Sequence, residues 1–235
     1  MQTYIADPVA NLCQLLPADG AARVVLGLVG LPGAGKSTQA RRWADAVNAR
    51  AQAPVMQTVG MDGFHLSRAD VAQLPPPRND LVRRGAPWTF DVPQLKRSLE
   101  QLHQRETSLA QAEVRWPDFD HGVGDPVADA IRIEPATRLV LVEGLYLLLP
   151  QAEWNLRSLF HQVWFLDVSY ATAMRQLTRR HCDSWGISEV EATARIEAND
   201  AINARTVHLT QCFAHALAQP LTLDQSLTLS NGNAL

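Results

Sequence analysis

The sequence predicts an α/β protein with three layers, in which helices cover both faces of a mostly parallel central sheet. Two observations predict it. Apolar runs typical of buried strands recur along the chain, at 23–29, 54–61, 137–142 and 161–167. Helical patterns follow the first and the last of these runs, at 39–50 and 169–181. With 235 residues, of which 46% are hydrophobic, the chain suits one domain with a sizeable core, and we expect a single domain over 1–235.

A glycine-rich loop joins the first strand to its helix. The stretch GLPGAGKST fits the pattern G-x-x-x-x-G-K-[ST] and includes Gly30, Gly33, Ala34, Gly35, Lys36, Ser37 and Thr38. The glycines let successive backbone N–H groups converge on one phosphate cluster, Lys36 reaches the β/γ-phosphates, and Ser37 offers its hydroxyl to Mg²⁺. The alternative is a glycine-rich turn with an accidental lysine. Strand and helix flanks of the required kind favour the phosphate loop, and with it the P-loop NTPase fold.

An acidic residue ends each of two apolar runs. Asp62 follows the run at 54–61, and Glu143 ends the run at 137–142. Ligands of open parallel sheets bind beyond the carboxyl ends of the strands. We therefore expect Asp62 and Glu143 to lie beside the glycine loop, with Glu143 close to Mg²⁺ or its water shell.

The segment 63–91 is predicted to be an irregular cover over a substrate-binding site. Three consecutive prolines, 75–77, forbid helix and sheet ladder alike, and Arg78, Arg83 and Arg84 follow. A long irregular excursion is usually functional or disordered. These arginines suit an anionic ligand, or they serve a solvated loop. Asp91 then caps a helix predicted over 92–104.

Residues 114–122 are predicted to form a short strand that runs into an acidic turn. Asp118, Asp120 and His121 form a metal cluster, a turn with side-chain-to-backbone hydrogen bonds, or a substrate-contacting loop. The turn is favoured over the metal cluster. A further short strand is expected at 130–135.

Arginines concentrate in the helical region after Asp167. Arg175 and Arg179 are four residues apart on one helix face, and Arg180 is adjacent. They form either a solvated basic face or a helical lid, over about 170–205, that closes on the polyphosphate. We expect residues 182–186 to interrupt the helix, and Ser188 to begin a second one over 189–204 through a capping box.

The two ends of the sequence and its composition complete the prediction. Residues 1–20 read as one short amphipathic helix, and the end of the sequence, which includes the apolar stretches 216–218 and 221–223, is expected to supply a last short strand and a tail. The net charge of −3 gives no basic field for nucleic acid, and three separated cysteines give no metal or disulfide pattern. No signal peptide or membrane span is recognisable, so we expect a soluble cytoplasmic protein that contacts no membrane. A homodimer is left open.

The order of motifs resembles a family of kinases. GLPGAGKST, MDGFH, RRGAPWTFD, PDFDHG, LVLVEGLYLLL and FLDV, followed by an arginine-rich helix pair, are similar to the phosphoribulokinase/uridine kinase/pantothenate kinase group of P-loop kinases. The nearest subgroup is bacterial, described as nucleoside/nucleotide kinase-like or fructose-transport-associated. The resemblance covers roughly 22–215. It implies ATP-dependent transfer of a phosphoryl group to a hydroxyl of a small metabolite, such as a sugar, a nucleoside or a pantothenate-like compound.

The resemblance also implies roles for individual residues. The loop residues and Arg175 would bind ATP, Ser37 and Glu143 would hold Mg²⁺, and Asp62, Lys36 and Arg179 would act in catalysis, although the match does not fix which lid arginine meets the phosphates. Acceptor contacts would come from Asp62, Phe64, His65, Arg84, Asp118 and His121. Two alternatives stay open, a nucleotide-dependent switch NTPase acting on a protein partner and a non-catalytic binder, as does the choice between ATP and GTP.

Overall fold

A computed structural model describes residues 2–18, 22–104, 112–120 and 122–221. A six-stranded sheet, in the order β1-β8-β7-β2-β6-β3, forms the centre, and all its neighbouring strands are parallel. Its strands are β1 (Thr3–Ile5), β2 (Val24–Val29), β3 (Met56–Gly60), β6 (Leu139–Gly144), β7 (Gln162–Leu166) and β8 (Ala216–Ala218). A separate antiparallel hairpin joins β4 (Val114–Asp120) to β5 (Asp125–Ile133).

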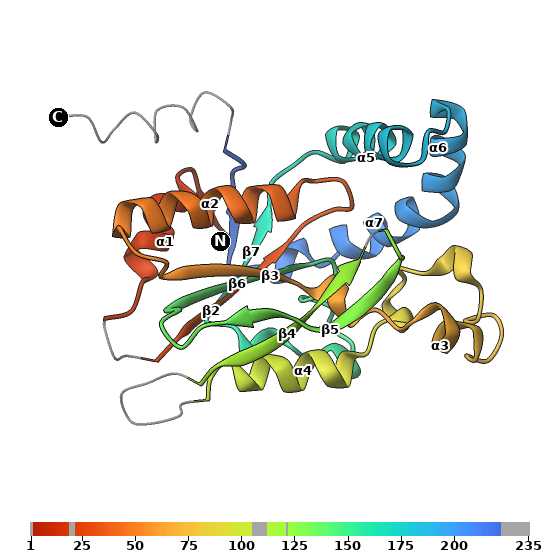
Figure 1. The fold of residues 1–235 in the computed structure, drawn as a ribbon. Helices are drawn as coiled ribbons and strands as arrows, with labels where there is room; N and C mark the ends of the chain where they lie inside the picture. The colour runs from red at the N-terminus through yellow and green to blue at the C-terminus, as the bar shows by residue number, and fades with distance from the viewer. Residues whose placement is uncertain (1, 19–21, 105–111, 121, 222–235) are drawn as a thin grey trace.

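Helices cover both faces of the sheet. The helices of the described residues are α1 (Pro8–Leu15), α2 (Lys36–Ala51), α3 (Arg68–Ala72), α4 (Val92–Gln101), α5 (Tyr170–Trp185), α6 (Glu189–Arg195) and α7 (Ala201–His208). Figure 1 shows α1 and α2 on one face, and α4 with the β4–β5 hairpin on the other. Asp91 caps α4 as predicted, because its Oδ1 accepts a hydrogen bond of 2.8 Å from the backbone N–H of Gln94. The predicted three-layer P-loop NTPase fold is confirmed.

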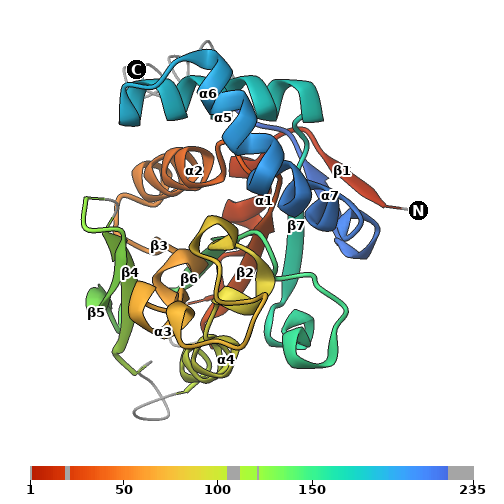
Figure 2. The same cartoon turned by 90° about the vertical axis from the view of Figure 1, so that its right-hand side faces the viewer.

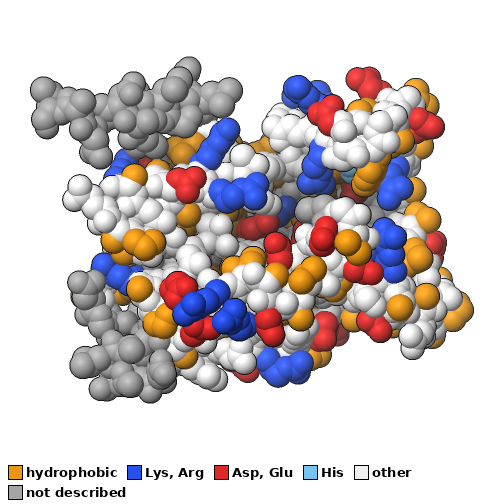
Figure 3. All heavy atoms as spheres, viewed as in Figure 1, with side chains coloured by type: hydrophobic (Ala, Val, Ile, Leu, Met, Phe, Trp, Pro, Cys, Tyr) orange, Lys and Arg blue, Asp and Glu red, His pale blue; other side chains and the backbone are white. Residues whose placement is uncertain are grey.

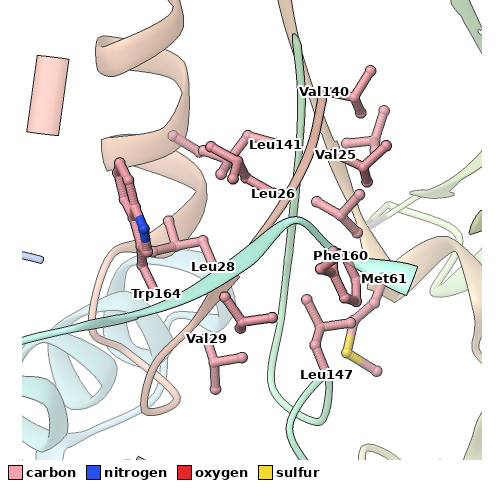
Figure 4. Close-up of a cluster of buried hydrophobic side chains, with 14 of the residues drawn as sticks. Val25, Leu26, Leu28, Val29, Met61, Val140, Leu141, Leu147, Phe160 and Trp164 are labelled. Carbon is pink, nitrogen blue, oxygen red and sulfur yellow. The ribbon is translucent and has the colours of Figure 1, made fainter. Parts of the chain in front are cut away.

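The core lies on both faces of the central strands, against α2 on one side and against α4 and β4 on the other. Leu26, Leu28 and Val29 of β2 are fully buried, as expected of a strand covered on both faces (Figure 4). Trp164 of β7 meets Trp43 of α2 edge-to-face, with ring centroids 6.3 Å apart. This packing holds the middle of α2 against β7, the neighbour of the strand that leads into the glycine loop.

The lid helices differ from the prediction at two points. The predicted interruption at 182–186 is wrong, because α5 continues to Trp185 and ends at Gly186, whose φ of 64° is left-handed and costs glycine little. The capping box at Ser188 is confirmed at the start of α6. However, the second helix contains a π-helical turn at Ile196–Asp200 between α6 and α7.

Smaller differences occur elsewhere. The predicted N-terminal helix is shorter and follows a strand, β1, that pairs with β8. The cover segment (residues 63–91) is largely irregular, as predicted, but contains α3 and short 3₁₀ turns at Met61–Phe64, Leu81–Arg83 and Pro87–Thr89. Strand β5 begins at Asp125, earlier than expected, because it pairs along the length of β4. None of the described helices is both long and apolar enough to cross a bilayer.

Candidate active site

The glycine loop presents the start of α2 as an anion site. Gly33 and Gly35 have φ angles of 78° and 83°, a left-handed conformation that glycine adopts without steric cost. Gly35 precedes α2, and no side chain caps the helix there. The first backbone N–H groups of the helix therefore remain available to phosphate oxygens. Lys36 folds back on the loop, where its Nζ donates to the carbonyl oxygens of Gly30 (3.1 Å) and Leu31 (3.2 Å).

The three strand ends meet beside this loop. In the sheet register Glu143 lies opposite both Leu28 of β2 and Gly60 of β3, and Asp62 follows Gly60 by two residues. The expected closeness of these strand ends is confirmed. The hydroxyl of Ser37 donates a hydrogen bond of 2.7 Å to Oε1 of Glu143. A hydroxyl and a carboxylate oxygen are thus side by side, which is the hard-oxygen chemistry that Mg²⁺ prefers.

Charges around Lys36 and Glu143 balance one another. Burial lowers the pKa of Lys36 and raises that of Glu143. Their mutual attraction acts against burial in both groups, and Asp62 also favours the charged form of Lys36. Arg180 acts on Lys36 in the opposite direction, by lowering its pKa, so this arginine is within electrostatic reach of the loop.

Close packing fixes the position of Asp62. A Cβ atom at Gly63 would lie 2.2 Å from the carbonyl oxygen of Pro117, so only glycine allows β4 to approach here. Trp116 donates from Nε1 to the carbonyl oxygen of Gly60 at 2.8 Å. The residues on both sides of Asp62 are therefore held against β4, and Asp62 itself is half-buried.

Phe64 and His65, which were predicted to contact the acceptor, instead pack against neighbouring aromatic rings and support the turn that carries Asp62. Phe64 is 1% exposed and packs edge-to-face on Trp116, so it belongs to the core and does not line the site. His65 lies between Phe90 and Phe119, with ring centroids 4.0 and 4.9 Å away. Its Nδ1 is 2.8 Å from the carbonyl oxygen of Asp62, so it also supports the turn that carries this aspartate.

Arg84 is bound by the protein itself. Its guanidinium donates to the carbonyl oxygens of Leu66 and Gly124 and forms a 2.6 Å ion pair with Asp125. Burial lowers its pKa and Asp125 counteracts that shift. The arginine side chain is only 11% exposed. This arginine therefore ties the cover segment to the β4–β5 hairpin.

The acidic turn is a hydrogen-bonded turn, as favoured. Oδ1 of Asp120 accepts from the backbone N–H groups of Gly122 (2.7 Å) and Val123 (3.1 Å). Asp118 accepts from the N–H of Phe119. His121 lies outside the described residues. Within the described part of the chain, no three His, Cys, Asp or Glu side chains gather as a metal cluster.

All three predicted lid arginines, Arg175, Arg179 and Arg180, are exposed. Arg175 donates to Oγ1 of Thr172, and Arg179 is 86% exposed beside Asp183, 3.7 Å away. Helix α5 nevertheless contacts the loop, because a Cβ atom at Gly33 would lie 2.3 Å from the carbonyl oxygen of Ala173. Figure 3 shows acidic and basic side chains together in the hollow between the α2 side of this face and the lid helices.

Sequence reasoning missed the role of Tyr146. Its hydroxyl donates 2.7 Å to the carbonyl oxygen of Gly85, and burial raises its pKa. It follows Glu143 by three residues, so one loop carries both the carboxylate of the site and a contact to the cover segment. A polar aromatic residue directly after an acidic strand end is the signal that could have identified it.

A glycine loop, a hydroxyl–carboxylate pair and an aspartate at one sheet edge define the class of P-loop kinases.

Comparisons with the sequences of known proteins identify the family. No family model matches the sequence. The chain is 36% identical over 211 residues to a candidate uridine kinase of Schizosaccharomyces pombe, covering 88% of each chain. It therefore belongs to the phosphoribulokinase/uridine kinase-like family of P-loop kinases.

Solved structures extend this similarity to the fold. A candidate fructose transport system kinase from Silicibacter sp. TM1040 superposes with a TM-score of 0.76 and 32% identity, over 92% of this chain and 100% of that one. The P-loop kinase YFH7 of Saccharomyces cerevisiae has a TM-score of 0.75 at 21% identity, over 90% and 97% of the two chains. Because the identity to YFH7 is only 21%, that similarity shows a shared fold and nothing about activity.

Proposed function

We propose that this protein transfers the γ-phosphoryl group of ATP to a hydroxyl of a small metabolite. The observation that carries the proposal is the 2.7 Å hydrogen bond between Ser37 and Glu143, at the same sheet edge as Asp62. It joins the phosphate loop to a second strand through oxygen atoms suited to Mg²⁺. The kinase names of the relatives point in the same direction.

The loop binds and neutralises the phosphates in this proposal. The N–H groups at the start of α2 bind the phosphate oxygens, and Lys36 exchanges the carbonyl oxygens of Gly30 and Leu31 for oxygens of the β- and γ-phosphates. Ser37 and Glu143 would hold Mg²⁺, which when bound neutralises charge on the phosphates. Two protein ligands suffice, since Mg²⁺ in such sites retains water and substrate oxygens.

Asp62 serves as the base. It orients the acceptor hydroxyl and accepts its proton while the oxygen attacks the γ-phosphorus and the bond to the β–γ bridging oxygen breaks. Arg180 is the lid arginine with the best support for a phosphate contact, because it already acts on Lys36. Arg175 and Arg179 would need the lid to turn inward before either met the nucleotide.

The cover segment favours an uncharged acceptor. Two of the three arginines that would suit an acceptor phosphate, Arg83 and Arg84, already donate to protein oxygens, and the third, Arg78, lies over the ring of Trp88. Releasing Arg84 would leave Asp125 without its 2.6 Å partner. A neutral sugar, polyol or nucleoside therefore fits better than its phosphorylated counterpart, and a contact from Asp118 to an acceptor hydroxyl is part of this proposal.

The test is a measurement of ADP release over matched pairs of acceptors. Each neutral compound, such as ribose, fructose or uridine, is assayed beside its phosphate ester, with an acceptor-free reaction as baseline. Asp62→Asn should retain nucleotide binding and lose about 10²–10⁴-fold in turnover. Asp45→Asn, on the exposed side of α2, is the matched control. Turnover by Asp62→Asn close to that of the unmodified protein would exclude the base role.

The same assay separates the kinase from a switch. ATP hydrolysis that needs no small acceptor and rises on adding another protein would favour the switch NTPase. Lys36→Ala should weaken nucleotide binding and turnover together, whichever acceptor is used.

A further inference from the structure

The turn at Arg83–Gly85 in the cover segment is bound by two asparagines of the lid. Asn199 donates from Nδ2 to the carbonyl oxygen of Arg84 at 3.1 Å, and its Oδ1 accepts from Nη1 of Arg83 at 2.8 Å. Asn203 donates to the carbonyl oxygen of Gly85 at 3.2 Å. These bonds join segments more than 110 residues apart in the sequence. In Figures 1 and 2 the α6–α7 arm descends from the lid toward the segment that carries α3.

The π-helical turn sets up this contact. It spans Ile196–Asp200 and so contains Asn199, and Asn203 follows one turn later in α7. Nδ2 of Asn203 is also 3.4 Å from Oδ1 of Asn199, so the two amides form one network. Such π-turns are rare in proteins overall, but those that do occur are often found at functional sites. Asn203 is only 2% exposed, and a buried amide with both ends bonded fixes one geometry.

The other end of the lid reaches the phosphate loop. Helix α5 passes so close to Gly33 that a Cβ there would lie 2.8 Å from Cβ of Leu177. Leu177 packs in turn with Ile196, the first residue of the π-turn, and with Ala201, which follows the turn. Continuous packing thus runs from the phosphate loop through α5 and the π-turn to the Arg83–Gly85 turn.

A third group closes the network on the metal side. Tyr146, three residues after Glu143, donates to the same Gly85 carbonyl oxygen that Asn203 contacts. Gly85 has a φ of 103°, a backbone conformation that residues with a side chain rarely adopt. The turn therefore depends on glycine at this position. The position of the cover segment is therefore set jointly by the lid and by the strand that ends in Glu143.

We propose that Asn199 and Asn203 are positioning residues that couple nucleotide binding at the loop to ordering of the acceptor cover. The proposal rests on the nucleotide site proposed above. Binding of nucleotide fixes α5 against the loop, the π-turn follows α5, and the asparagines hold the Arg83–Gly85 turn in its acceptor-binding position. By linkage, an acceptor that orders the turn strengthens nucleotide binding by the same factor.

Hydrogen exchange measured by mass spectrometry tests the coupling without an acceptor. The full-length protein is compared with and without Mg²⁺ and a non-hydrolysable ATP analogue, and peptides from 78–88 and 189–208 are followed. In the unmodified protein, bound analogue should slow exchange in both peptides, by about tenfold in 78–88. Asn199→Ala should abolish the slowing in 78–88 and retain it in 189–208. Glu197→Ala, exposed on the same π-turn, is the matched control.

A double-mutant cycle completes the test. Arg83 donates to Oδ1 of Asn199, to the backbone carbonyl oxygens of Ala198 and Asn199, and to Oδ1 of Asn203. Because these bonds belong to one network with those of Asn199, Arg83→Met combined with Asn199→Ala should lose no more of the response than the more damaging of the two changes alone. Asn199→Asp keeps a hydrogen-bond acceptor for Arg83 and should restore part of the slowing of exchange in 78–88. If Asn199→Ala does not fold, Arg83→Met gives the same measurement from the cover side.

Two results would overturn the coupling while leaving the kinase proposal intact. One is full slowing of 78–88 in Asn199→Ala, and the other is an unmodified protein that binds the analogue with no change in 78–88. An unmodified protein that binds no analogue at all would instead remove the proposed function, and the coupling with it.

Discussion

The contact between α5 and the phosphate loop predicts a difference between two glycine-to-alanine substitutions. Gly33 and Gly35 both have left-handed φ angles, 78° and 83°. A Cβ at Gly35 meets nothing within 4 Å, whereas a Cβ at Gly33 lies 2.3 Å from the carbonyl oxygen of Ala173. Gly35→Ala therefore introduces backbone strain alone, and Gly33→Ala adds a clash with a backbone atom of α5.

The magnitudes follow from these contacts. A left-handed alanine costs roughly 1–2 kcal/mol, reduced by about 0.4–1 kcal/mol because the alanine also restricts the unfolded chain. Gly35→Ala should therefore lower the free energy of unfolding by about 1 kcal/mol. At Gly33, α5 or the loop must retreat by about 1 Å to restore ordinary contact, since 2.3 Å must become at least 3.4 Å. Such overpacking adds about 1–3 kcal/mol.

Urea unfolding of the ligand-free protein measures the difference. Both variants are compared with the unmodified protein at one pH, with the slope m checked for equality so that a shift in midpoint reports stability. Gly33→Ala should be less stable than Gly35→Ala by about 1–3 kcal/mol. Equal loss of stability in the two variants would refute the contact between α5 and the loop, and with it one link in the coupling proposed above.

Three further predictions address the site and the lid. Glu143→Gln keeps an oxygen for Ser37 but removes the charge, so the Mg²⁺ concentration needed for half-maximal ADP release should rise about 10–100-fold; an unchanged Mg²⁺ titration would contradict the metal role. Gly63→Ala places a Cβ 2.2 Å from the carbonyl oxygen of Pro117 and shifts Asp62, so turnover should fall about 10²-fold while calorimetry shows nucleotide affinity preserved. Burial and nearby Arg180 and Arg195 lower the pKa of His181 to about 4 from 6.5, so its contribution to stability is complete above pH 6.5 and is lost as pH falls toward 4. Between pH 7 and 4 the unmodified protein should therefore lose more free energy of unfolding than His181→Phe in urea, with Asp200, 3.8 Å from Nε2, offsetting part of the loss; parallel curves would argue against a buried neutral His181.

The sequence predicted the parts of the site that depend on local pattern. The strand–loop–helix context of Lys36, and the placement of Asp62 and Glu143 at one sheet edge, follow from strand ends in a parallel sheet. Those relations hold whatever the rest of the chain does. The fold class was predictable for the same reason, because apolar runs and helical periods alternate along the chain.

Partners distant in the sequence could not be predicted. Phe64 is in the core because Trp116 packs against it, and Arg84 is engaged because Asp125 lies 41 residues away in sequence but 2.6 Å away in space. A pattern of residue types reports which side chains are charged or aromatic. It does not report whether each finds a partner inside the protein, which decides whether it faces a ligand.

Short and unusual elements also escaped prediction. Strand β1 has three residues, too few to show an alternation of apolar and polar positions. The π-turn at Ile196–Asp200 changes helical geometry without any proline or glycine to mark it. Consequently, the side of the lid that Asn199 faces became visible only in three dimensions.

The order of strands in the sheet has a consequence for synthesis of the chain. Strand β2, which leads into the phosphate loop, is bordered by β6 and β7, so Val24 pairs with Leu139 and Leu26 with Gln162. The loop therefore leaves the ribosome more than a hundred residues before the strands on either side of it. Until those strands emerge, β2 is an apolar segment with both edges open, the kind of segment that chaperones shield during translation. A nascent chain halted before residue 139 should accordingly carry the whole nucleotide-binding motif and yet bind no nucleotide.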